Sequence, residues 1–146
     1  MKKKLVRILL FMLPFMALVL ATTNNSVQLV NMETGEKILG SFFVMLNDSF
    51  AALCPVLAAA CSMFSLIAAL IFVFSGKNGF LKASAWLSFA GASVAEIPVV
   101  SRGEYLILPH VLFPILLLVH FFLCAFSKKL GLQEKEAPAP RRLERH

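Results

Sequence analysis

The chain has 146 residues, of which 59% are hydrophobic and only 15% are charged, and its mean hydropathy is +0.81. Soluble domains carry about 25% charged residues, so this composition excludes an ordinary soluble protein and indicates an integral membrane protein. The net charge is +6. We expect no nucleic-acid binding, because basic and aromatic residues do not interleave along any segment.

Four apolar stretches have close to the roughly 20 residues that a helix needs to cross about 30 Å of hydrocarbon. They cover residues 5–22, 50–74, 83–100 and 105–126. None shows the alternating polarity of barrel strands, and the backbone polar groups of a span must be satisfied within it, so helices are predicted. The sequence therefore predicts an all-α membrane protein, a bundle of four transmembrane helices in one domain, residues 1–127.

The first stretch has two interpretations. A basic start, an apolar run and the small residues Val19 and Ala21 match a secretory signal, whose cleavage would remove residues 1–21. Alternatively, Arg7 can reach back to the interface and Thr22 can lie at the far boundary, which makes the run long enough to span. We favour the uncleaved helix, although the sequence leaves both interpretations open.

The basic residues predict the orientation. All but two of the 14 Lys and Arg residues, Lys37 and Arg102, lie before or at the start of the first stretch, between the second and third, or after the fourth. Short cytoplasmic loops retain Lys and Arg, so both termini are expected in the cytoplasm, with the protein in the plasma membrane. Residues 128–146 are predicted to be a flexible, basic cytoplasmic tail, and the basic side would attract anionic lipid headgroups.

Residues 23–49 form the only long segment on the opposite side. Residues 26–38, SVQLVNMETGEKI, predict a small extracytoplasmic β-hairpin between the first and second helices. The next run, residues 38–46, is too apolar to be fully exposed to water, so we expect it to continue the sheet or to lie at the membrane interface.

Small side chains recur every three or four residues in the second and third helices, which places them on one face of each. Small residues let membrane helices approach closely, and the short turn at residues 75–82 predicts a tight antiparallel pair. We call these residues the small-residue seam: Ala51, Cys54, Ala58, Cys61, Ser65, Ala68, Ser84, Ser88, Gly91 and Ala95. In the fourth helix, Pro109 can lie in the first turn, whereas Pro114 is expected to kink the helix.

Glu96 and His110 are polar residues inside the third and fourth stretches. Each lies seven residues from Gly103, so in an antiparallel pair they meet at one depth, about 10 Å along each helix. An intramembrane carboxylate costs roughly 2.5 to 3.5 kcal/mol at the bilayer centre, and a partner lowers that cost. The pair is either a structural tie, which we favour, or a proton-exchanging site. His120 points about 80° away from His110 and is expected to be a packed or interfacial residue.

No catalytic residue, metal site or cofactor is expected. No cluster supplies three or four metal ligands at one depth, and the chain has no nucleotide-binding loop, H-E-x-x-H motif or Ser/His/Asp set. The order of elements resembles the claudin-like tetraspan layout in outline. The outer segment lacks the W…W…C…C pattern of those proteins, so adhesion is not implied.

Our preferred hypothesis is a non-enzymatic accessory or interaction subunit that acts by association in the lipid bilayer, with another membrane protein or with itself. The alternative is a homo-oligomeric, proton-linked transporter or channel that uses Glu96 and His110.

Overall fold

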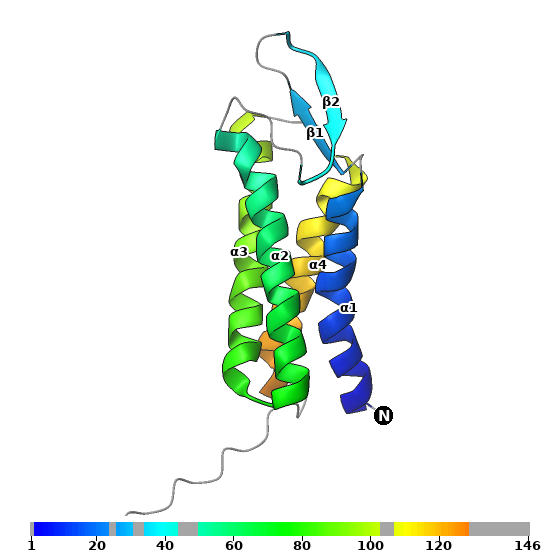
Figure 1. Cartoon of the computed structure of the whole chain (residues 1–146), viewed down its shortest axis with the longest axis vertical. Helices are drawn as coiled ribbons and strands as arrows, with labels where there is room; N and C mark the ends of the chain where they lie inside the picture. Colours follow the sequence, from blue (N-terminus) through cyan, green and yellow to red (C-terminus); the bar gives the residue numbers. More distant parts are fainter. Residues whose placement is uncertain (1, 24–25, 31–33, 44–49, 103–106, 129–146) are drawn as a thin grey trace, which may run out of the picture.

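The computed structural model describes residues 2–23, 26–30, 34–43, 50–102 and 107–128. These residues are mostly helical, and Figure 1 shows their elements. In chain order they are α1 (Lys2–Thr22), β1 (Val27–Val30), β2 (Lys37–Gly40), α2 (Phe50–Ser75), α3 (Asn78–Arg102) and α4 (Leu108–Ala125), followed by a 3-10 turn at Phe126–Lys128. The predicted tail lies outside the described residues except for Lys128, and so does the predicted turn around Gly103.

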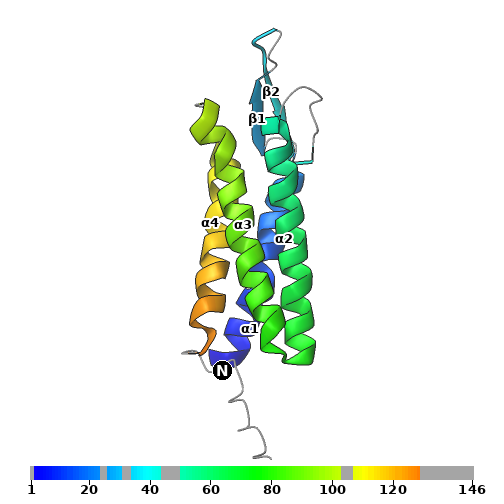
Figure 2. The same ribbon diagram turned by 90° about the vertical axis from the view of Figure 1, so that its left-hand side faces the viewer.

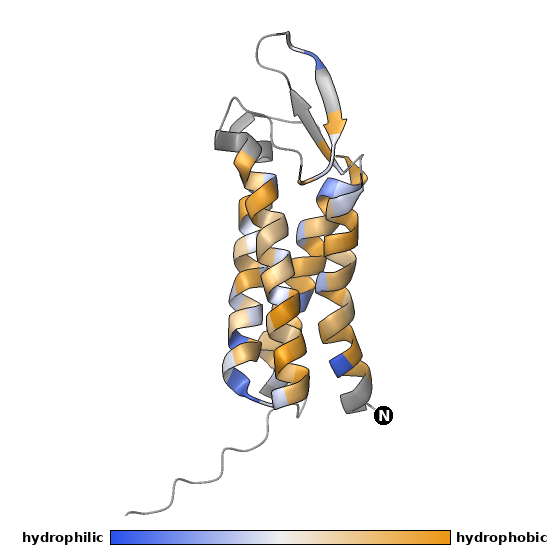
Figure 3. Ribbon diagram, in the orientation of Figure 1, coloured by the Kyte–Doolittle hydropathy of each residue, from blue (hydrophilic) through white to orange (hydrophobic). Residues whose placement is uncertain are grey.

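The four helices lie side by side along the long axis of the molecule (Figures 1 and 2). Each packs against two neighbours: α2 against α3, α3 against α4, α4 against α1, and α1 against α2. The start of α1 and the α2–α3 turn lie at one end, and the strands lie at the other. Figure 3 shows apolar residues along the helices and hydrophilic ones at the lower ends of α1 and α3.

Three of the helices are long and apolar enough to cross a membrane, at Leu5–Thr22, Leu53–Ser75 and Leu108–Ala125. They indicate an integral membrane protein in a lipid bilayer. The fourth predicted span, in α3, is not among these three. It has the length, but its apolar run is interrupted by Lys82, Glu96 and several serines.

The ends of the helices differ from those of the apolar stretches. α1 and α3 begin earlier than predicted, because helical backbone bonding continues through the polar residues that flank an apolar run. α4 begins later, at Leu108, because Ile107 is extended (φ −94°, ψ 148°) and Pro109 occupies the first turn, where an N–H is not needed. α4 continues through Pro114, so the kink predicted there stays a prediction.

The two strands connect α1 to α2. They pair antiparallel, with Val27 opposite Gly40 and Val30 opposite Lys37. The predicted turn is residues 33–36, and residues 31–33, which follow β1 and include the start of that turn, lie outside the described residues. The structure therefore does not support the complete β-hairpin predicted from the sequence, and two strands of this length are at best marginally stable alone.

Phe42 closes the end of the helical core nearest the strands. Its backbone N–H donates to the carbonyl oxygen of Ala21 at 3.0 Å, and its side chain is fully buried. Its ring lies 4.4 Å from that of Phe113 and 5.7 Å from that of His110, between ring centroids. Part of the apolar run at residues 38–46 thus packs into the molecule, in addition to continuing the sheet.

The helices approach closely at Gly91 of α3. A Cβ added there would lie 3.0 Å from Cβ of Cys61, 3.1 Å from Cδ1 of Leu117 and 3.3 Å from the carbonyl oxygen of Ala58. A larger residue would therefore collide with both α2 and α4. Glycine lets three helices meet at this level.

Candidate functional site

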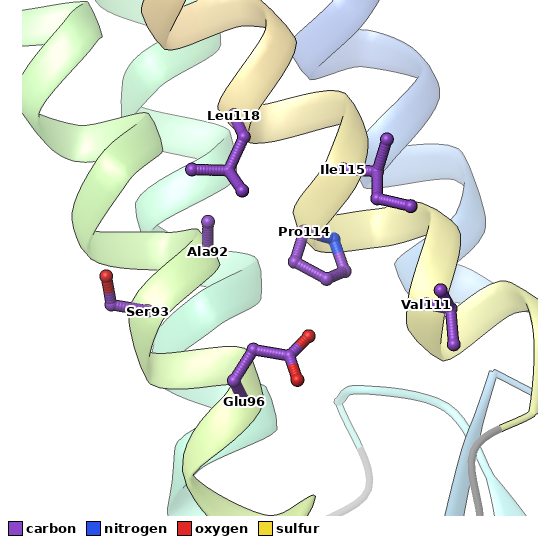
Figure 4. Close-up of a pocket in the computed structure, with 7 residues that line it drawn as sticks. All are labelled: Ala92, Ser93, Glu96, Val111, Pro114, Ile115 and Leu118. Atoms are coloured by element: carbon purple, nitrogen blue, oxygen red, sulfur yellow. The ribbon is translucent and has the colours of Figure 1, made fainter.

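A pocket between α3 and α4 contains Glu96 (Figure 4). Its volume is about 300 Å³, and α3 lines it with Ala92, Ser93 and Glu96, whereas α4 lines it with Val111, Pro114, Ile115 and Leu118. The carboxylate points across the pocket toward Pro114. Ser93 and Ile115 are exposed, so the pocket opens on the side of the helical core. We call it the α3–α4 groove; its walls are apolar apart from the carboxylate and one hydroxyl.

Pro114, which lines the groove, also affects the backbone bonding of α4. Proline has no N–H, so the carbonyl oxygen of His110, four residues earlier, lacks its usual helical donor. A carboxylate and a carbonyl both accept hydrogen bonds, and only the carboxylate is charged. The carboxylate lines the groove, so the groove favours a ligand that donates hydrogen bonds and carries positive charge.

His110 lies in the first turn of α4 and is 4% exposed. Its ring stacks on Phe42 and contacts the backbone of Ala95. The Glu96 carboxylate lies close enough to act electrostatically on this ring. Nε2 of His110, however, has no hydrogen-bond partner in the described part of the chain. The structure thus brings Glu96 and His110 into the same region without a hydrogen bond from Nε2 to the carboxylate.

His120 is fully buried and begins a chain of hydrogen bonds across the helices. Its Nδ1 lies 2.7 Å from Oγ of Ser88 on α3, which lies 2.7 Å from Oγ of Ser65 on α2. Oγ of Ser65 lies 3.0 Å from Oγ of Ser84, and the Ser84 hydroxyl donates to the carbonyl oxygen of Ser65 at 2.8 Å. We call these four residues the His120 network.

The other side of the His120 ring is satisfied by α1. The ring hydrogen-bonds to the backbone of Leu10, and Nε2 lies 3.5 Å from Sγ of Cys124. Pro14 explains why Leu10 is available, since a proline leaves the carbonyl four residues earlier without its helical donor. The Ser62 hydroxyl in turn donates to the carbonyl oxygen of Pro14 at 3.2 Å. A proton on Nε2 fits these contacts and leaves Nδ1 to accept from Ser88.

The His120 network was not predicted from the sequence. The sequence places Ser65, Ser84 and Ser88 in the small-residue seam because of their size, and it predicts only that His120 is packed or interfacial. One signal was present: Pro14 frees a carbonyl oxygen inside an apolar helix, and a buried carbonyl requires a donor. Because the donor comes from another helix, its identity could not be read from spacing along the chain.

Most residues of the small-residue seam have described side chains, and these point into the protein. Buried members are Cys54, Ala58, Ser65, Ala68, Ser84, Ser88, Gly91 and Ala95, and Cys61 is half-buried. The side chain of Ala51 lies outside the described residues. The role of the seam in holding α2 to α3 stays a prediction.

Within the described residues, no group of three or more His, Cys, Asp or Glu side chains could hold a metal ion. In comparisons with known proteins, no family model, curated protein or solved structure matched the chain. The function is therefore argued from the geometry of the site.

Proposed function

We propose that the protein is a non-enzymatic, multi-pass membrane protein that acts by association, as an accessory or interaction subunit. In this proposal all four helices cross the plasma membrane, and both ends of this chain lie in the cytoplasm. Two observations support the four-span arrangement. α3 packs against α2 and α4, with Ser84 and Ser88 hydrogen-bonded inside the protein, and nearly all basic residues fall on one side of such an arrangement.

The packing of α1 supports its retention in the mature protein. Leu10, Ala17 and Ala21 are fully buried, and α1 supplies the backbone acceptors for His120 and Ser62. Cleavage after Ala21 would leave these donors without acceptors inside the membrane, where each unsatisfied group costs several kcal/mol.

The position of Glu96 is the observation that supports association with a partner most strongly. The polar side chains of the His120 network satisfy one another inside the protein, whereas the Glu96 carboxylate lines a groove that opens on the side of α3 and α4. A charged group at membrane depth is expensive unless a partner pairs with it. The α3–α4 groove is therefore best explained as a contact surface that a partner covers in the assembled state.

The chemistry of the groove defines the partner. Apolar walls fit the side chains along one face of an apolar helix that lies over the groove. The carboxylate fits a single Lys or Arg on that face, since a cationic donor makes the strongest hydrogen bonds to a carboxylate. The partner in this proposal is a membrane span of another protein with one basic residue facing α3 and α4.

Site-specific photo-crosslinking in the native membrane tests this proposal. A photo-crosslinking residue placed at Ile115 lies in the groove, and one at Ile67 on α2 is a matched control, because the native side chains are 47% and 44% exposed. We expect a discrete polypeptide adduct at Ile115, none at Ile67, and a basic residue within the crosslinked span. Glu96→Gln should lower the adduct yield about tenfold or more, because it removes one charge of a desolvated pair.

Three results would contradict the proposal. They are equal adducts at the two positions, an adduct at Ile115 that Glu96→Gln leaves unchanged, and an adduct at Ile115 that contains lipid alone.

A proton-linked transporter or channel is the second candidate. It is favoured by the electrostatic interaction between Glu96 and His110 and by the unpartnered Nε2 of His110. In vesicles loaded with a pH-sensitive dye, this alternative predicts proton flux that Glu96→Gln abolishes while assembly stays intact. The absence of flux through the wild-type protein would exclude it.

A further inference from the structure

A second cleft lies between α1 and α2, at the end of the molecule that contains the start of α1 and the α2–α3 turn. Its volume is about 270 Å³, and its walls include Phe11 and Met12 of α1 and Val73 and Phe74 of α2. Phe74 is 86% exposed. An apolar cleft edged by so exposed an aromatic ring is suited to lipid and poorly suited to water.

Arg7 also lines this cleft and is the one charged residue among the described residues that do so. The sequence contains no Asp or Glu in residues 1–32, 49–95 or 105–133, so α1, α2, α4 and most of α3 carry no acid that could pair with it. Lys77 in the α2–α3 turn and Lys82 near the start of α3 add positive charge at the same end. The counter-ion of Arg7 must therefore come from outside these helices.

The size of the cleft limits what can occupy it. A helix with its side chains is about 10 to 12 Å across, so a helix could lie over this cleft of about 270 Å³ but could not enter it. A segment of one acyl chain is narrow enough to lie between α1 and α2. Basic pockets between membrane helices bind anionic headgroups, and a guanidinium matches the geometry of a phosphate.

We infer that this cleft is a binding site for an anionic phospholipid, with an acyl chain between α1 and α2 and the phosphate at Arg7. This inference is independent of the α3–α4 groove, which lies on the opposite pair of helices. The bound lipid would cover the apolar walls and neutralise Arg7, and it would fix α1 against α2 at the membrane boundary.

Native mass spectrometry of the protein, released from nanodiscs that contain equal amounts of phosphatidylglycerol and phosphatidylcholine, tests the headgroup contact. The wild-type protein should retain phosphatidylglycerol in preference to phosphatidylcholine. Arg7→Gln should lower this preference about fivefold, the effect of one basic residue near an anionic membrane surface. Lys82→Gln is the matched control, because Lys82 is exposed near the same end but lies outside the cleft, and it should change the preference less than twofold.

A second pair of variants tests the acyl-chain contact. Met12→Trp would fill the cleft and keep Arg7, whereas Met63→Trp places the same bulk at a position outside it, and the two methionines are 42% and 40% exposed. Only Met12→Trp should reduce the retained phosphatidylglycerol. The inference is wrong if Arg7→Gln behaves like the wild type, if both charge variants lose the preference equally, or if Met12→Trp retains as much lipid as Met63→Trp.

Discussion

Both ring nitrogens of the buried His120 have hydrogen-bond partners, and these lie on other helices. Ser88 of α3 supplies one hydrogen bond, and the backbone of Leu10 of α1 supplies the other. A polar group without a partner is expensive in hydrocarbon, so only arrangements that bring α1 and α3 to α4 at this level are favourable. We conclude that the His120 network specifies how the helices are placed.

Ser88→Ala tests this role. The change removes the hydroxyl that hydrogen-bonds to Nδ1 of His120 and to Oγ of Ser65. We expect it to lower the free energy of unfolding by about 1 to 2 kcal/mol, near the upper values for hydrogen bonds between membrane helices. Ser93→Ala on the same helix is the control, since Ser93 is exposed and its hydroxyl donates only to the carbonyl oxygen of Phe89 one turn earlier. It should cost less than about 0.5 kcal/mol.

Reversible unfolding in bicelles measures the change in the free energy of unfolding for Ser88→Ala and for Ser93→Ala. Equal stability of the two variants would mean that the His120 network does not stabilise the fold.

Some residue-level features could be predicted from the sequence and others could not. Equal distances from Gly103 suggested that Glu96 and His110 meet, and the structure places them within electrostatic reach. Counting along a helix gives depth, but it does not give the direction of a side chain, so the α3–α4 groove and the unpartnered Nε2 were not foreseen. The burial of Phe42 also went unpredicted, because its partners lie on α4.

At the scale of the helices, Gly91 determines how closely α3 approaches its neighbours. Gly91→Leu places a full side chain where even a Cβ would lie 3.0 Å from Cβ of Cys61. Overpacking of a close-packed interior costs typically 1 to 3 kcal/mol, and we expect a loss at the upper end of that range or failure to assemble. Gly79→Leu is the control, because an added Cβ there meets nothing within 4 Å.

Thermal unfolding in detergent micelles distinguishes the two glycine variants. If Gly91→Leu is tolerated as well as Gly79→Leu, close packing at Gly91 does not hold α3 to α2 and α4.

Helices were more predictable than their ends and connections. Apolar length predicted four spans, and three of the helices, α1, α2 and α4, are long and apolar enough to cross a membrane. The span predicted in α3 is not among these three, since its serines lower its hydropathy although Ser84 and Ser88 are hydrogen-bonded inside the protein. The start of α4 depended on the backbone at Ile107 and on Pro109, which hydropathy does not report.

At the scale of the whole molecule, the two proposed contact sites lie on opposite pairs of helices and near opposite ends. The α3–α4 groove offers a negative charge for a partner span, and the cleft between α1 and α2 offers a positive charge for lipid. A partner bound at α3 and α4 would leave α1 and α2 in contact with the bilayer. Both assignments depend on all four helices crossing the membrane.

Topology mapping in intact cells tests that arrangement most directly. Thr34 is exposed between the two strands, so Thr34→Cys should react with a membrane-impermeant maleimide applied from outside. Epitope tags at the two ends of the chain should both become accessible only after the cells are permeabilised. Three spans would place one end of the chain outside the cell, so a tag that is accessible without permeabilisation would contradict the four-span account. Labelling of Thr34→Cys only after permeabilisation would contradict it as well.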